Sequence, residues 1–316
     1  MITTIIRRER ICGGRNMDKV NAAFSERMAF ITNEGRREAN EDGLLVMDGA
    51  RRVLAVADGL GGHYGGEVAS QTALTVLERE IRSGTSLNKS FERAHQGVKR
   101  IQKAERVLSK MRTTLSAAEI FADHVEAVSC GDSFIFLAGN GKMGMLNLPH
   151  TTAGNIYKRG NPGLVFPHYD YKGFKKHMAN TLWEFPKYNT LSSCIGTKNK
   201  IKLYSGSYPL HAGDRLFLCT DGLTDYLPSA KIIYALTKMK KSSLETIVSA
   251  LYTHAIASMD WFIPLGYEGD NITMVLYEHG RVADTDDKTT LPPKRSSDNV
   301  LLKAIRFCMK FFKPQP

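Results

Sequence analysis

Residues 53–70 read VLAVADGLGGHYGGEVAS, and this stretch decides the fold. The apolar run Val53–Ala57 is typical of a buried central strand, and a carboxylate, Asp58, follows directly at its end. Five glycines occur among the next eight residues, which lets a loop backbone approach a ligand closely. Beyond them, Glu67–Ser83 has apolar side chains on one helical face. The stretch therefore predicts a strand, an acidic loop and a helix whose N-terminus is directed back towards the carboxylate.

The remaining sequence predicts two groups of strands, with helices between and after them. Strands are expected at Met28–Thr32, Gly43–Met47 and Arg52–Ala57, between Leu115 and Leu146 around the turn signal Gly139-Asn140-Gly141, and at Ile201–Tyr204, Arg215–Cys219 and Ile272–Tyr277. Helices are expected at Glu67–Ser83, Leu87–Met111, Ser229–Lys238 and Ser243–Ser258, the last beginning with a capping box at Ser242–Glu245. Because strands and helices do not alternate one by one, this order predicts antiparallel sheets packed together with helices outside.

Composition excludes several classes of protein. Hydrophobic residues make up 42% and charged residues 24% of the 316 residues, as in ordinary globular proteins. No apolar run approaches the ~20 residues that span a bilayer. In the first fifteen residues the charges follow the apolar stretch, the reverse of a secretory signal. The five scattered cysteines form no Cys-x-x-Cys pair, which argues against a disulfide framework and a zinc site and favours a cytoplasmic protein.

The net charge of +11 does not indicate a nucleic-acid binder. Residues 21–145 and 191–280 each contain equal numbers of acidic and basic residues, so the excess lies in the two ends and in residues 146–190. A nucleic-acid interface needs a continuous basic face, which this distribution does not provide.

Four aspartates stand at the ends of apolar runs, in the pairs Asp42-Gly43, Asp58-Gly59, Asp221-Gly222 and Asp270-Asn271. Each pair alone reads most simply as a β-turn. Asp58 and Asp221, however, follow runs expected to be buried strands, and no Lys or Arg partner is evident nearby. Carboxylates at the edge of a core are costly unless they are paired or bind a metal. Oxygen ligands without clustered His or Cys favour Mg²⁺ or Mn²⁺.

At these residues the chain resembles the metal-dependent protein serine/threonine phosphatases, the PPM or type 2C family, in its bacterial form. Five motifs carry the resemblance, and they occur in the order of the family between residues 37 and 273. They are Arg37–Asp42 (REANED), Val56–His63 (VADGLGGH), Ser129–Ser133 (SCGDS), Cys219–Asp225 (CTDGLTD) and Asp270–Thr273 (DNIT). The implied fold is an α+β, α-β-β-α sandwich of two mainly antiparallel sheets flanked by helices.

The resemblance also implies a set of site residues. Metal ligands for two or three Mn²⁺ or Mg²⁺ ions would be Glu41, Asp58 as the bridging ligand, the Gly59 carbonyl, Asp132, Asp221 and Asp270, with Asp132 and Asp221 holding the third ion. Asp42 would orient water, and Arg37 would clamp the substrate phosphate, with Arg36 as an alternative. Phe134 stands where the family has arginine, and Leu60 where eukaryotic members have a histidine. His63 is a candidate general acid; the alternatives are that it is a structural or solvent-exposed histidine and that metal-bound water protonates the leaving group.

The implied reaction is hydrolysis of phosphoserine and phosphothreonine in proteins, by metal-activated water attacking the phosphate in line without a covalent intermediate. Partners would be phosphorylated proteins and a cognate serine/threonine kinase, and not nucleic acid. The alternative is a catalytically silent module that binds phosphoproteins. Glu41, Asp58, Asp221 and Asp270, the ligands of two ions, are all present, which favours the enzyme.

The expected organisation is an N-terminal extension (1–24), a phosphatase domain (25–280) and a linker with a basic amphipathic tail (281–316). Residues 146–190 form an insert rich in aromatic and basic residues. The insert is interpreted either as a substrate-recognition flap or as an excursion packed on the domain. In the tail, basic residues recur at helical spacing, which suits an anionic membrane surface, a partner, or packing on the chain's own domain.

Overall fold

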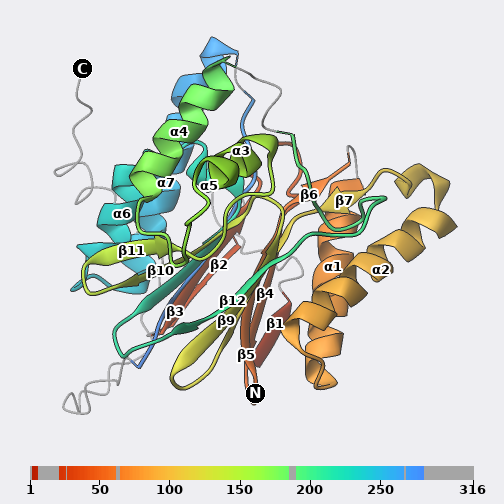
Figure 1. Ribbon diagram of the computed structural model, residues 1–316, viewed down its shortest axis with the longest axis horizontal. Helices are drawn as coiled ribbons and strands as arrows, with labels where there is room; N and C mark the ends of the chain where they lie inside the picture. Colours follow the sequence, from red (N-terminus) through yellow and green to blue (C-terminus); the bar gives the residue numbers. More distant parts are fainter. Residues whose placement is uncertain are drawn as a thin grey trace, which may run out of the picture.

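Two six-stranded antiparallel sheets lie face to face at the centre of the protein (Figure 1). The structure, a computed structural model, describes residues 2–5, 21–25, 27–61, 65–184, 190–266 and 268–280. The first sheet has the order β1-β4-β5-β8-β9-β12, with strands Ile2–Ile5, Gly43–Asp48, Arg52–Ala57, Leu115–Ile120, His124–Cys130 and Tyr204–Pro209. The second has the order β11-β10-β13-β14-β3-β2, with strands Lys142–Met145, Phe134–Gly139, Arg215–Cys219, Ile272–Glu278, Met28–Asn33 and Asn21–Phe24. A small ribbon joins β6 (Gly59–Leu60) to β7 (Arg112–Thr113).

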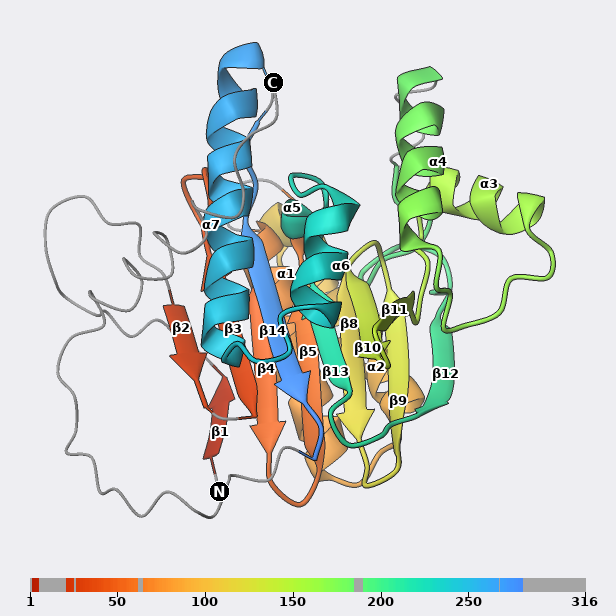
Figure 2. The same cartoon turned by 90° about the vertical axis from the view of Figure 1, so that its left-hand side faces the viewer.

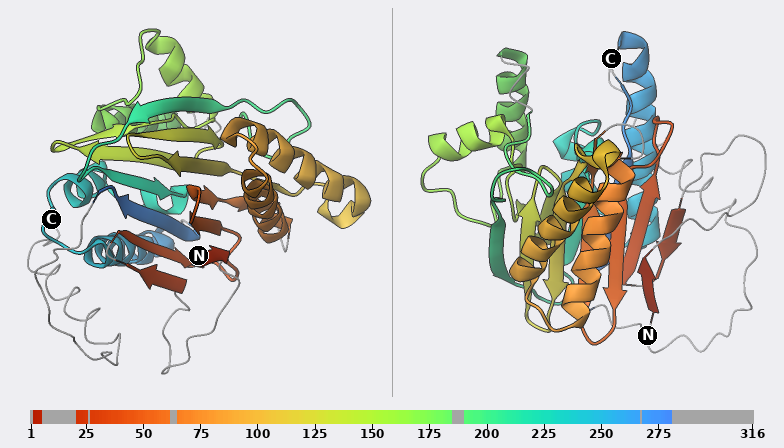
Figure 3. Two further views of the ribbon diagram at one scale, coloured as in Figure 1. Left: turned by 90° about the horizontal axis from the view of Figure 1, so that it is seen from below. Right: turned by 90° about the vertical axis from the view of Figure 1, so that its right-hand side faces the viewer.

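Helices cover both outer faces of this sandwich (Figure 3). Helices α1 (Gly65–Arg82) and α2 (Leu87–Ala104) pack on the first sheet. Helices α6 (Ser229–Thr237) and α7 (Leu244–Phe262) pack on the second, together with α3 (Thr152–Gly160) and α4 (Tyr171–Glu184) at its β10–β11 side. The short helix α5 (Asp221–Thr224) follows β13 directly, and 3₁₀ turns occupy Arg106–Leu108 and Ile263–Leu265. The expected α-β-β-α sandwich is therefore confirmed.

Burial on both faces explains why the central strands read as continuous apolar runs. In β5, Val53, Ala55 and Ala57 face helices α1 and α2, whereas Leu54 and Val56 face the other sheet. Successive side chains of a strand point to opposite faces, so a strand between a helix layer and a second sheet needs apolar residues at every position. This packing places the end of β5, and with it Asp58, at a rigid point of the fold.

The turn between β10 and β11 matches the sequence signal. Asn140 and Gly141 both have positive φ angles, of 51° and 77°. Two central residues of this kind are required by a type I′ hairpin turn, which fits the right-handed twist of the paired strands.

Several element boundaries differ from the sequence expectation. The strand expected at 201–204 begins only at Tyr204, because the chain before it buries Ile201 beneath α2 without pairing with β9. Helix α2 ends at Ala104, where the backbone of Glu105 becomes extended without a Gly or Pro signal. Helix α7 is capped by Ser243, whose hydroxyl accepts from the Thr246 N–H, and not by the expected capping box.

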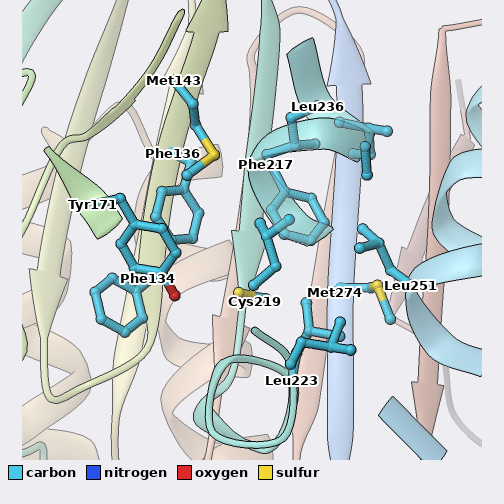
Figure 4. Packing of buried hydrophobic residues seen from close by; sticks show 14 of the residues in the cluster. Phe134, Phe136, Met143, Tyr171, Phe217, Cys219, Leu223, Leu236, Leu251 and Met274 are labelled. Carbon is cyan, nitrogen blue, oxygen red and sulfur yellow. The ribbon is translucent and has the colours of Figure 1, made fainter. Parts of the chain in front are cut away.

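The insert is helical rather than irregular. Its helices α3 and α4 bury Tyr157, Tyr171 and Phe174 in the same apolar cluster as Phe136 and Phe217 of the second sheet. Figure 4 shows Tyr171 of α4 beside Phe134 and Phe136. At least these insert aromatics pack on the domain, as the second interpretation of the insert expected.

Three sequence expectations fall wholly or partly on residues that the structure does not describe: the N-terminal extension, His63 and the tail. Strands β1 and β2, from the expected N-terminal extension, pair with β4 and β3 at the sheet edges. His63 and the tail (281–316) lie outside the described residues. Of the helices in the described ranges, none is long and apolar enough to cross a membrane.

The aromatic cluster predicts a large stability effect at one position. Phe136 is fully buried, with its ring centroid 4.9 Å from that of Tyr171 and 6.2 Å from that of Phe217. Phe136→Ala should lower the free energy of unfolding by about 3–5 kcal/mol, because it leaves a cavity in a closely packed core. Urea denaturation measures this loss. Val107→Ala, at a side chain that is 91% exposed, is the control and should change stability by less than about 0.5 kcal/mol. Equal effects of the two substitutions would contradict this account of the core.

Candidate metal centre

Four aspartates from both sheets meet at one end of the sandwich. Asp58 follows β5, Asp132 follows β9, Asp221 follows β13, and Asp270 precedes β14. One carboxylate oxygen from each of Asp58, Asp132 and Asp221 lies within 4.8 Å of the others. The two sheets, packed face to face, thus bring together these three carboxylates, which are up to 163 positions apart in the sequence (221 − 58). The structure confirms the convergence that the sequence could only suggest.

Backbone hydrogen bonds fix the position of Asp58. Its N–H donates to the Thr114 Oγ1 at 2.8 Å, and its carbonyl accepts from the Thr114 N–H and the Thr113 hydroxyl, each at 2.8 Å. These bonds satisfy the main chain and leave the carboxylate directed to the cluster. Thr113, in β7, and Thr114, directly after it, belong to none of the five motifs, so their contact with Asp58 could not be read from the motifs.

Asp42 is buried directly behind the cluster. Its Oδ2 accepts a hydrogen bond from the Thr220 hydroxyl at 2.9 Å, and Thr220 in turn accepts from the Thr273 N–H at 3.1 Å. Burial raises the pKa of Asp42 to about 7, although hydrogen bonds from Thr273 and Thr220 offset part of the rise. The side chain is 5% exposed, so it can reach a ligand of the cluster but not bulk water.

Glu41 supplies an oxygen that lacks a partner. Its Oε1 is buried and accepts no hydrogen bond from any residue in the described part of the chain. Glu41 can pack this closely against the main chain only because its neighbours are glycines. A Cβ on Gly66 would lie 2.6 Å from this oxygen, and a Cβ on Gly59 would lie 2.5 Å from the Glu41 carbonyl oxygen. A buried carboxylate oxygen without a donor, beside three converging aspartates, fits a site that takes a hard divalent cation.

Asn271 holds the Glu41 loop against the second sheet. Its Oδ1 accepts from the Glu41 N–H at 2.9 Å, and its Nδ2 donates to the carbonyls of Glu34 and Ala39 at 2.9 and 2.8 Å. All three bonds depend on an amide that both donates and accepts, which explains the Asn of the Asp-Asn-Ile-Thr sequence. Asn271 is therefore a positioning residue, a role that its place in the motif does not by itself reveal.

Arg37 lies at the rim of the cluster, and Arg36 does not. The Arg37 Nε is 3.5 Å from Asp270 Oδ1, and its Nη1 is 3.2 Å from Glu268 Oε2. Arg36 instead forms a two-point ion pair with Asp260 of α7, at 2.6 and 2.9 Å. Of the two arginines considered from the sequence, Arg37 is the one placed beside the acidic residues.

Burial and mutual repulsion raise the pKa values of the carboxyl groups in this cluster. Burial and then the neighbouring carboxylates raise the pKa values of Asp58 and Asp221 well above the usual value, and burial and Asp225 raise that of Asp132 to about 7. Burial also raises the pKa values of Glu41 and Asp270. A hydrogen bond from the Gly66 N–H to the Glu41 carboxyl, and the charge of Arg37 on both groups, oppose this rise. The aspartates are partly open to solvent, yet protein atoms surround their charged ends closely enough for desolvation to dominate. Divalent cations would relieve this repulsion.

Residues 32–252 match the protein phosphatase 2C family. That range is well over half of the chain, so the chain belongs to this family and is an enzyme of the serine/threonine phosphatase class. The family resemblance inferred from the five motifs is thereby confirmed.

Named relatives and solved structures agree with this assignment. The chain is 28% identical over 263 residues to the serine/threonine phosphatase stp of Listeria innocua, covering 79% of this chain and 94% of that protein. It is 29% identical over 281 residues to PstP of Mycobacterium tuberculosis, covering 81% of this chain but 48% of PstP. Its fold matches the S. agalactiae serine/threonine phosphatase (TM-score 0.62, 25% identity, 80% and 98% of the two chains). It also matches the PstP catalytic domain in complex with two manganese ions (TM-score 0.61, 25% identity, 80% and 97%).

The raised pKa values predict that the metal-free protein loses stability as the pH rises. The folded chain holds protons on Asp42 and Asp132 with pKa values of about 7, whereas an unfolded aspartate releases its proton near ~3.9. The contribution of these protons to the free energy of unfolding is complete below about pH 4 and is lost as the pH rises to about 7. The loss is about 1.4 kcal/mol per pH unit for each proton that the folded state binds and the unfolded state does not.

Urea denaturation in EDTA between about pH 5.5 and about pH 8 measures the effect. Asp132→Asn should flatten the pH dependence, and excess Mn²⁺ should reverse it because the ion binds deprotonated carboxylates. Metal-free stability that is constant or rises over this range would contradict the electrostatic account.

Proposed function

We propose that this chain removes phosphate from phosphoserine and phosphothreonine in other proteins, with divalent cations held by the candidate metal centre. The convergence of Asp58, Asp132 and Asp221 beside the unpartnered Glu41 oxygen carries the proposal. The printed names of the relatives, which are serine/threonine phosphatases, support the substrate class.

Six residues would hold the cations: Glu41, Asp58, Asp132, Asp221 and Asp270 through carboxylates, and Gly59 through its carbonyl. Asp58 would be the bridging ligand, as the family resemblance implies, and its carboxylate lies within 4.8 Å of those of Asp132 and Asp221. Bound Mn²⁺ or Mg²⁺ would activate a water for in-line attack and shield the phosphoryl oxygens. The manganese complex of PstP supports Mn²⁺ as the first ion to test.

Arg37 would bind the substrate phosphate at the rim. A guanidinium presents paired N–H donors that match two phosphate oxygens. Its present partner Glu268 is 85% exposed, so a phosphate dianion can displace this carboxylate at little cost.

Asp42 would orient the attacking water from behind the cluster. The hydroxyls of Thr220 and Thr273 donate to its carboxyl and fix the orientation of this group beside the centre. Because the carboxyl is buried and fixed, it can hold that water in one geometry, which is the main requirement of an in-line displacement.

The expected partners are phosphorylated proteins, with a cognate kinase acting on the same substrates, in the cytoplasm. In the insert, Lys172 and Lys176 are exposed on α4 and are free to meet an acidic substrate surface, so they remain the candidates for a recognition flap. Lys175 points elsewhere, towards Asp225.

The direct test is release of phosphate from a phosphothreonine peptide with Mn²⁺, Mg²⁺ or EDTA. Activity should require the metal and should fall at least about 10³-fold in Asp58→Asn, since removal of a bridging charge disrupts the whole centre. Asp48→Asn, at an exposed strand end, is the matched control and should retain activity. If folded, metal-bound wild-type protein releases no phosphate, the catalytically silent phosphoprotein-binding module becomes the better account.

Arg37 and its exposed partner predict opposite kinetic effects. Arg37→Ala should lower kcat/KM for the peptide by about 10–100-fold, because it removes charge-assisted hydrogen bonds worth about 1.5–3 kcal/mol. Glu268→Gln should lower KM by at most about fivefold, since an exposed ion pair contributes about 1 kcal/mol or less. Steady-state kinetics distinguish the two. An unchanged kcat/KM in Arg37→Ala would remove Arg37 from the phosphate site.

A further inference from the structure

Helix α4 presents one of its three lysines to the metal centre. The helix is anchored on the second sheet by the buried residues Tyr171, Phe174 and Met178. Lys172 and Lys176 lie on its exposed side, whereas the Lys175 side chain is only 25% exposed. Figure 2 shows α4 rising beside the end of the sandwich at which α5 lies, where the carboxylates converge. The packing of the helix therefore directs this single ammonium towards the acidic cluster.

The Lys175 ammonium borders a small acidic cavity. Its Nζ lies 3.3 Å from Asp225 Oδ1. Together with Asp225, the carboxylates of Asp132 and Asp221 line a cavity of about 30 Å³, which is room for about one water molecule or one ion. Among the described residues that line it, Lys175 carries the only positive charge.

Phe134 is an apolar residue in the lining of the same cavity. Phe134 lines it at the position where the family motif has arginine, and its ring packs against Tyr171 and Phe174 of α4 at 5.9 and 6.2 Å between centroids. The apolar side chain at position 134 thus helps to dock α4. The docked helix in turn supplies the cation, Lys175, that faces the carboxylates.

We propose that the Lys175 ammonium takes the place of a third divalent cation beside Asp132, Asp221 and Asp225. This inference rests on the proposed metal centre. The family resemblance implied a third ion held by Asp132 and Asp221, but an ion in this cavity would lie beside the Lys175 ammonium. Repulsion between like charges at such short range weakens its binding strongly. The centre then operates with two divalent ions and one ammonium, which also fastens the insert to the active site.

The test is a count of bound Mn²⁺ by isothermal titration calorimetry and equilibrium dialysis. Wild-type protein should bind two ions, with a third only at much higher concentration. Lys175→Gln should bind the third ion about tenfold more tightly, because the nearby positive charge is removed. Lys175→Arg, which keeps the charge, should resemble the wild type.

Lys176→Gln on the same helix is the matched control and should leave the count unchanged. Lys175→Met retains the apolar stem and gives the same comparison if the glutamine variant does not fold. Equal affinities for the third ion in wild type, Lys175→Gln and Lys175→Met would overturn the inference while leaving the two-ion centre intact. No Mn²⁺ binding by folded wild-type protein would instead overturn the metal centre on which the proposed function depends.

Discussion

Repulsion among buried carboxylates is the constraint on which the rest of the structure depends. Asp58, Asp132 and Asp221 bring their oxygens within 4.8 Å of one another, and Asp42 lies behind them in the core. Such an arrangement is stable only if the surrounding structure is rigid and if protons or cations neutralise the charge. The two sheets provide the rigidity, because their central strands are packed on both faces. The acidic end of the sandwich therefore lowers the stability of the fold locally, and burial of the apolar core offsets this loss.

Neutral hydrogen-bonding residues hold the charged ones in place. Thr220 and Thr273 link the carboxyl of Asp42 to the second sheet, Thr114 fixes the main chain of Asp58, and Asn271 joins the Glu41 loop to two carbonyls. None of these groups carries charge, so they orient the carboxylates without neutralising them. This division leaves the carboxylate oxygens available to the divalent cations of the proposed metal centre.

The insert changes the chemistry at one side of the centre. Its aromatic residues extend the core of the second sheet, so α4 is part of the domain in packing terms, and the same packing brings the Lys175 ammonium to Asp225. An element that the sequence suggests only as a flap or an excursion therefore contributes a charge to the site. Surface recognition, if the insert has this role, falls to the exposed lysines on its other side.

The sequence by itself determined the fold class, the family and the three aspartates that converge, Asp58, Asp132 and Asp221, because strand patterns and the short acidic motifs are local features that a few adjacent residues define. The predicted start of β12 and the predicted end of α2 were wrong, and α3 and α4 were not predicted. The start of β12 and the two helices depend on long-range packing of residues such as Ile201 and Phe174. The sequence expectations for cellular location and for the tail remain predictions. Only the tertiary structure decided that Arg37 rather than Arg36 borders the cluster and that Lys175 faces Asp225, since both depend on which side chains two separately folded elements bring within ion-pair distance.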